Sequence, residues 1–165
     1  MSTQSRLSYF GWTVVLLSSS PAMAQQTQGI VAKNLADVRL AAIPDAPACF
    51  VAAVEEGNPA KEASVMMMRG TRGCSVPRHW HPSAERIMLI KGSARAEVAD
   101  TSVVTLTPGG YLSVPPRHPM RFACTTSCEL FVYTDGPFEM HYVDATGREI
   151  PAAEALKLTK RGARP

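Results

Sequence analysis

The sequence predicts an all-β fold, a single antiparallel β-barrel followed by a short C-terminal helix. Most of the chain consists of short stretches rich in Val, Ile, Leu, Met and aromatic residues, and Gly, Pro, Asp and Asn separate them. This alternation of short strands and turns is typical of a barrel or a sandwich. The 165 residues, of which 45% are hydrophobic, fit one ordinary globular domain. The sequence contains no internal repeat that would indicate a second barrel.

The first 24 residues are predicted to be a secretory signal peptide. Arg6 precedes an apolar run over residues 9–17, and an Ala-Met-Ala pattern ends at Ala24. The run is shorter than the roughly 20 residues that a membrane-spanning helix needs, and no other segment is expected to span a membrane. The mature chain is therefore expected to be periplasmic or secreted, and to begin with an N-terminal arm or strand over residues 25–45.

The barrel is expected over residues 46–145. Turn signals rich in Gly, Pro, Asn and Asp divide this range at residues 55–59, 99–101, 107–110 and 135–137. The β-branched, Met-rich and aromatic stretches between them predict strands over residues 48–54, 63–69, 86–90, 94–98, 102–106, 111–114, 129–134 and 138–143. Residues 146–165 are expected to form a helix and a tail, and Pro151 begins the predicted helix over residues 151–158.

The four cysteines predict two disulfides, because exported proteins usually hold their cysteines oxidised. Cys124 and Cys128 flank a short Thr-Thr-Ser turn and are predicted to pair with each other. Cys49 and Cys74 would then pair across two neighbouring strands. Four cysteines allow three connectivities, and free thiols beside a metal site are the alternative.

Residues 73–92 carry the pattern G-x5-H-x-H-x3-E-x6-G. His79 and His81 project from the same side of an extended strand, because successive side chains alternate between its faces. A short Pro-Ser-Ala turn can bring Glu85 back beside them. Two imidazoles and a carboxylate suit a divalent transition metal such as Fe, Mn, Ni, Cu or Zn. These three residues are the candidate metal ligands.

The pattern resembles the first signature motif of the cupin superfamily, and Gly73, His79, His81, Glu85 and Gly92 occupy its positions. Cupins are small antiparallel β-barrels that usually hold a metal with three histidines and one glutamate. The resemblance covers residues 48–143. It implies that His79, His81 and Glu85 bind a metal ion.

The second cupin motif should supply the last histidine, and here the sequence departs from the family. Met120 stands where the histidine belongs, and Cys124 stands where an asparagine belongs. His118 occurs two residues earlier, on the same face as Met120 if this stretch is extended. The prolines within residues 115–119 favour extended backbone but oppose regular strand pairing. The fourth ligand can therefore be His118, or Met120, whose soft thioether would favour Cu(I), or no protein residue.

Three other features are assigned to packing rather than to chemistry. Met66, Met67 and Met68 are expected to fill the core, because methionine suits irregular interiors. Trp80 should face away from the two flanking histidines. His141 is expected to be a surface or pairing residue.

The predicted function is that of an exported cupin that binds a small ligand at a divalent metal held by histidine and glutamate. A metal-dependent oxygenase or isomerase is one version of this function, with Glu85 as a catalytic base. The alternative is a non-catalytic ligand-binding or sensing cupin with a degenerate metal site. A net charge of +3 is too small to indicate nucleic-acid binding. No membrane partner is expected, and the resemblance allows a homodimer.

Overall fold

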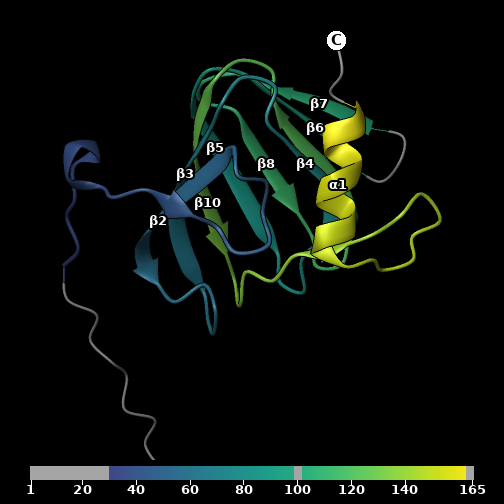
Figure 1. The fold of residues 1–165 in the computed structure, drawn as a ribbon. Coiled ribbons are helices and arrows are strands. Elements are labelled where there is room, and N and C mark those ends of the chain that lie inside the picture. Colours follow the sequence, from purple (N-terminus) through teal and green to yellow (C-terminus); the bar gives the residue numbers. More distant parts are fainter. Residues whose placement is uncertain (1–29, 99–101, 163–165) are drawn as a thin grey trace, which may run out of the picture. The chain divides into compact units, whose positions relative to one another are not determined.

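The structure is a computed structural model, and it describes residues 30–98 and 102–162, with side chains as far as residue 157. Two antiparallel sheets and one C-terminal helix make up most of this part of the chain (Figure 1). The predicted all-β fold with a short C-terminal helix is therefore confirmed. The predicted signal peptide, the predicted turn at residues 99–101 and the end of the predicted tail lie outside the described residues.

The larger sheet has six strands in the order β1-β2-β3-β10-β5-β8. Its members are β1 (Ala41–Ala42), β2 (Phe50–Gly57), β3 (Ser64–Gly70), β10 (Cys128–Thr134), β5 (Glu85–Lys91) and β8 (Tyr111–Val114). The buried pattern of β10 alternates along its whole length, so that Leu130 and Val132 face the interior. A short 3-10 helix, Leu35–Asp37, precedes β1.

The smaller sheet has five strands in the order β11-β4-β9-β6-β7. Its members are β11 (His141–Tyr142), β4 (Ser75–Trp80), β9 (Met120–Cys124), β6 (Ala94–Val98) and β7 (Ser102–Leu106). The helix α1 (Ala152–Gly162) packs against β4 and β11. Among the described residues, no helix is long and apolar enough to cross a membrane.

The hydrophobic core draws side chains from both sheets. Buried apolar residues of the larger sheet face those of the smaller sheet, and they include Phe50, Met66, Met68, Ile87, Leu89, Leu130 and Val132 on one side and Ala94, Ala96, Met120 and Phe122 on the other. Met66, Met67 and Met68 are all buried, and Met66 and Met68 belong to this core as expected. Polar side chains that enter this apolar interior are therefore the candidate functional residues.

Two segments differ from what the sequence predicted. Residues 120–124 form a regular strand, β9, which pairs with both β4 and β6, because the prolines end at Pro119 and leave the following N–H groups free to pair. The strand predicted over residues 138–143 is reduced to His141–Tyr142. Just before it, the carbonyl of Glu139 accepts a hydrogen bond from a histidine side chain instead of from a neighbouring strand.

The four cysteines lie in two pairs, and no described cysteine is free. The structure joins Cys49 to Cys74 and Cys124 to Cys128, which is the pairing predicted from the sequence. The two pairs are neighbours, since the Cys124 N–H donates to the carbonyl of Cys74 at 2.9 Å. They tie β2, β4, β9 and β10 together, away from the histidines.

Candidate functional site

Three buried polar side chains gather where β4 ends and β5 begins. His79 is the penultimate residue of β4, His81 follows the strand, and Glu85 opens β5. Each is at most 5% exposed, so that all three are withdrawn from solvent. The imidazole rings of His79 and His81 meet edge to face with centroids 5.0 Å apart. The turn at residues 82–84 brings Glu85 back beside them, as the spacing of the motif predicts.

Backbone carbonyls fix both imidazoles in the same tautomer. The Nδ1–H of His79 donates to the carbonyl of Pro77 at 2.7 Å, and the Nδ1–H of His81 donates to the carbonyl of Glu139 at 2.7 Å. A carbonyl can only accept, so both Nδ1 atoms carry the proton. Each neutral ring therefore presents its Nε2 lone pair to the interior, which is the arrangement that metal-binding histidines usually have.

Two buried atoms at this site have no hydrogen-bond partner among the described residues. They are Nε2 of His81 and Oε2 of Glu85. The other carboxylate oxygen, Oε1 of Glu85, lies 3.7 Å from Nε2 of His81, which is too long for a hydrogen bond. Buried polar atoms are nearly always satisfied, and leaving one unsatisfied costs about 1–3 kcal/mol. Two such atoms in neighbouring side chains make this cluster a candidate binding site.

Burial favours the uncharged form of all three groups. It lowers the pKa of His79 to about 4, and the neighbouring His81 adds to this effect. Burial likewise lowers the pKa of His81 to about 4. The same desolvation raises the pKa of Glu85 to about 7, against the opposing influence of His79. Glu85 can therefore hold or release a proton near neutrality.

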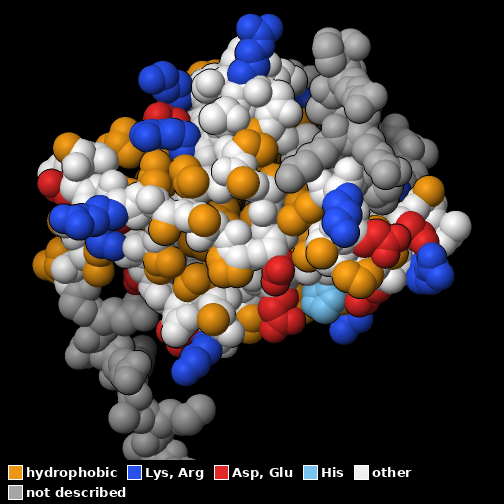
Figure 2. All heavy atoms as spheres, viewed as in Figure 1, with side chains coloured by type: hydrophobic (Ala, Val, Ile, Leu, Met, Phe, Trp, Pro, Cys, Tyr) orange, Lys and Arg blue, Asp and Glu red, His pale blue; other side chains and the backbone are white. Residues whose placement is uncertain are grey.

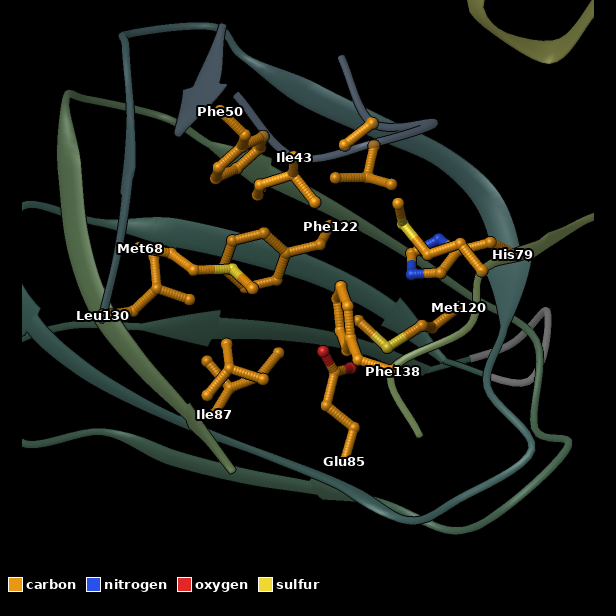
Figure 3. A pocket seen from close by; sticks show the side chains of 14 residues that line it. Ile43, Phe50, Met68, His79, Glu85, Ile87, Met120, Phe122, Leu130 and Phe138 are labelled. Carbon is orange, nitrogen blue, oxygen red and sulfur yellow. The ribbon is translucent and has the colours of Figure 1, made fainter. Parts of the chain in front are cut away.

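Two of the three polar residues, His79 and Glu85, lie at one end of a cavity that is otherwise apolar. His79 and Glu85 line this cavity together with Ile43, Phe50, Met68, Ile87, Met120, Phe122, Leu130 and Phe138. Figure 3 shows His79, Glu85 and Met120 at one end, whereas Phe50, Met68 and Leu130 lie at the other. The cavity measures about 40 Å³, well below the roughly 300–1,000 Å³ of pockets that hold drug-sized ligands. Only a small molecule fits inside.

The two candidates for the fourth ligand lie in different places. Met120 is the cross-strand partner of His79, is 2% exposed and lines the cavity. His118 is exposed, and its Nδ1–H donates to the carbonyl of Pro116 at 3.1 Å. The intervening Pro119 separates His118 from the paired part of β9, so that the strand presents Met120 to the interior instead. The structure does not bring His118 to the cluster.

The donor set fits a metal ion in its chemistry but not in a preassembled geometry. The described residues contain no group of three or more His, Cys, Asp or Glu side chains arranged to hold a metal ion as they stand. However, His79 and His81 present Nε2 lone pairs, and Glu85 carries an unsatisfied oxygen beside them. These three side chains would hold the ion after small shifts of their ends.

Sequence reasoning missed the residues that complete this end of the cavity. Phe138 stacks on His81 with ring centroids 4.7 Å apart, and Met140 also lines the cavity. Tyr142 donates its hydroxyl to the carbonyl of Asp45 at 2.7 Å, and its ring lies 6.0 Å from that of His79. The alternation of Phe138, Met140 and Tyr142 along the chain was a usable signal, because it places all three on one side of an extended segment.

Residues flanking the site form a stack on its outer side. Trp80 faces away from its neighbouring histidines and stacks on His141 with ring centroids 3.9 Å apart. The guanidinium carbon of Arg117 lies 5.1 Å from the centre of the Trp80 ring. The Arg117 N–H donates to the carbonyl of His81 at 2.8 Å. These contacts hold Trp80, which lies between the two histidines, and the backbone carbonyl of His81 in place.

A surface groove leads toward the cavity. It follows β1 and β2, is lined by Ala41, Ala42, Ala52 and Val54 among others, and shares Ile43, Phe138 and Met140 with the cavity. Figure 2 shows hydrophobic side chains gathered around the position of β1, with Lys and Arg side chains mainly at the margin of this face. The three shared residues therefore lie between the groove and the site.

Comparison with known proteins identifies the type of domain. Residues 66–135 match the family described as Cupin domain. An RmlC-like cupin from Shewanella frigidimarina is 18% identical with a TM-score of 0.54, and the alignment covers 64% of this chain and 88% of that one. KdgF from a Halomonas species is 12% identical with a TM-score of 0.55, over 67% of this chain and 94% of that one.

A third similar structure is that of the polyketide cyclase RemF from Streptomyces resistomycificus. It is 17% identical with a TM-score of 0.55, and the alignment covers 68% of this chain and 82% of that one. No curated protein sequence matches the chain. At these low identities the similarity establishes the fold, and the activity has to be argued from the site.

Proposed function

The chain contains a cupin-superfamily domain, and we propose that this domain binds a transition metal ion through His79, His81 and Glu85 and a small ligand beside it. One observation carries the proposal. Two buried imidazoles, each held by a carbonyl at Nδ1, leave their Nε2 atoms free of that carbonyl, and they lie beside Glu85, whose Oε2 has no partner among the described residues. Among the described residues, Nε2 of His81 and Oε2 of Glu85 have no hydrogen-bond partner, whereas metal coordination would use both of them together with His79.

The cavity restricts the class of ligand. Its apolar end is lined by residues such as Phe50, Phe122 and Leu130, while its polar end offers His79 and Glu85. The matching ligand is a small molecule with one polar group and an apolar body. The groove beside Ile43, Phe138 and Met140 is the proposed route of entry.

The proposed chemistry divides between the ion and Glu85. A bound metal ion would supply Lewis-acid or redox chemistry to the polar group of the ligand. When it leaves the metal, Glu85 would exchange a proton with the ligand, which suits an oxygenase or an isomerase. The apolar walls would exclude water from this exchange.

A metal-free ligand-binding or sensing protein is the second candidate. It is favoured by Met120 at the position of the expected fourth histidine, and by the lack of a preassembled metal geometry among the described residues. In this version, Nε2 of His81 and Oε2 of Glu85 would bind the polar group of the ligand directly.

We also propose that the protein works outside the cytoplasm. The charged start, apolar run and Ala-Met-Ala pattern of residues 1–24 support export. The two cysteine pairs support an oxidising compartment, where disulfides persist.

Metal analysis of the purified mature protein tests the proposal. Wild type is compared with His79→Ala, His81→Ala and Glu85→Ala by mass spectrometry, after dialysis against Fe, Mn, Ni, Cu and Zn in turn. His118→Ala is the matched control, because His118 is exposed and lies outside the cluster. We expect near-stoichiometric metal in wild type and in His118→Ala, and loss in the other three. Wild type that stays metal-free, with its fold verified by circular dichroism, would overturn the proposal in favour of the second candidate.

A further inference from the structure

We propose that the ion preferred by this site is monovalent copper, and that the thioether sulfurs of Met120 and Met140 bind it together with His79, His81 and Glu85. The inference rests on the proposed function, since it assumes a metal at the polar end of the cavity, and it narrows the identity of that metal. Two methionines and two histidines form an uncharged, soft donor set, and thioethers select Cu(I) among the biological metals.

Met120 is held against His79 by the pairing of β4 with β9. The two residues are direct cross-strand partners, so their side chains leave the sheet on the same face and begin about 5 Å apart. Met120 is buried and lines the cavity. Figure 3 shows its side chain at the same end of the cavity as His79 and Glu85.

Met140 reaches the same end from the segment that precedes β11. Its sulfur lies 3.7 Å from the hydroxyl oxygen of Tyr142, whose proton is donated to the carbonyl of Asp45, and the ring of Tyr142 lies 6.0 Å from that of His79. The preceding carbonyl, that of Glu139, fixes His81. Residues 139–142 therefore carry a sulfur donor and orient one imidazole at once.

The surroundings favour a monovalent ion. Most of the cavity wall is apolar, and moving a charge into such surroundings costs more for a dication than for a monocation. Glu85 is a harder donor than the imidazoles and thioethers, and its single carboxyl group is the one proposed ligand that can carry a negative charge. Thiolates, which would also bind copper, are excluded here because every described cysteine is paired.

Packing is the competing explanation for methionines in a core, because they fill irregular spaces well. The chain supplies a matched comparison in Met68. This residue is buried and lines the same cavity, but Figure 3 shows it at the end away from His79, near Leu130. If packing alone explained the methionines, replacing Met68, Met120 or Met140 by leucine would have the same effect on metal binding.

The test measures binding of Cu(I) alone, without air, by competition with a chromophoric Cu(I) chelator. Wild type is compared with Met120→Leu, Met140→Leu and Met68→Leu, and Zn(II) affinity is measured on the same samples. A thiol assay verifies that the disulfides are intact, because reduced cysteines would bind copper. We expect Met120→Leu and Met140→Leu each to weaken Cu(I) binding by at least the roughly 10–100-fold that loss of an outer-sphere partner causes.

Met68→Leu should leave Cu(I) affinity unchanged, and none of the three leucine variants should weaken Zn(II) binding. Zn(II) bound through His79 and His81, with Cu(I) binding weaker or insensitive to the two methionines, would overturn the copper assignment while the proposed metal site stands. Wild type that binds neither ion would overturn both.

Discussion

The two ends of the cavity follow opposite rules. The apolar end, built from residues such as Phe50, Phe122 and Leu130, buries hydrocarbon against hydrocarbon, which is the dominant source of stability in a folded protein. The polar end buries His79, His81 and Glu85 and leaves two of their atoms without partners. Burial without a partner lowers stability. The difference indicates that burial of the apolar end stabilises the fold, whereas burial of the polar end does not.

The largest expected effect comes from truncating the apolar end. Phe122 is 4% exposed and points into the cavity from β9. Phe122→Ala should lower the free energy of unfolding by about 3–5 kcal/mol, because an enlarged cavity adds its own cost to the lost burial. Urea denaturation measures the change. Its neighbour Arg121 is exposed, and Arg121→Ala should stay within about 0.5 kcal/mol; equal losses at both positions would contradict the assignment.

The polar end should control how stability varies with pH in the metal-free protein. His79 and His81 titrate near pH 6.5 when unfolded but near 4 when folded, so the unfolded state binds two more protons between pH 4.5 and 6.5. Glu85 titrates near 4.5 when unfolded and near 7 when folded, so in the same pH range the folded state binds one more proton at Glu85 than the unfolded state does. The unfolded state thus gains one net proton, and stability should rise by at most about 1.4 kcal/mol per pH unit.

The rise should total about 2 kcal/mol between pH 4.5 and 6.5, and stability should then level off toward pH 7, because the partly protonated histidines of the unfolded state and the proton on folded Glu85 nearly cancel. Glu85→Gln removes the opposing proton, so its slope in the same window should be about twice that of wild type. Chemical denaturation at several pH values with a chelator present measures both slopes. A wild-type profile that is flat across this window would show that the histidines are not buried as neutral rings.

The fold could be predicted from the sequence because its signals are local. Strands 94–98, 102–106 and 111–114 match their predicted bounds, since turn residues flank each of them. The strand predicted over residues 138–143 was wrong for most of its length. In this segment the carbonyl of Glu139 accepts a hydrogen bond from the side chain of His81 instead of from a neighbouring strand. Apolar alternation alone cannot distinguish these two roles.

The candidate site was predictable in part, for a similar reason. The spacing of His79, His81 and Glu85 follows from strand alternation and one turn, and the structure gathers these three residues. Met140 was missed because no motif contains it; its alternation with Phe138 and Tyr142 indicated a shared face, but only the tertiary packing of Tyr142 against His79 shows which residues that face meets. The choice between His118 and Met120 depended on where β9 begins, which the prolines before it obscured.

A substitution that turns the polar end into an apolar one should raise stability. Glu85→Met removes a buried carboxyl whose Oε2 has no partner among the described residues, and it keeps a similar volume. We expect the free energy of unfolding at pH 7 to rise by about 1–3 kcal/mol, while metal retention is lost. Glu56→Met, at an exposed position of β2, should stay within about 0.5 kcal/mol. Destabilisation by Glu85→Met would mean that the carboxyl supports the fold.

The smallest expected effect is on the stability of the leucine variants of Met120 and Met68, which compare the two ends directly. Both residues are buried and line the cavity, and leucine nearly conserves the volume of methionine, so each change should cost less than about 1.5 kcal/mol. Thermal unfolding of the metal-free variants measures the cost. Similar small losses would mean that packing alone does not require sulfur at position 120, which leaves metal binding to explain it. A much larger loss in Met120→Leu than in Met68→Leu would instead make Met120 a packing residue, and the boundary between the two ends would then lie between Met120 and His79.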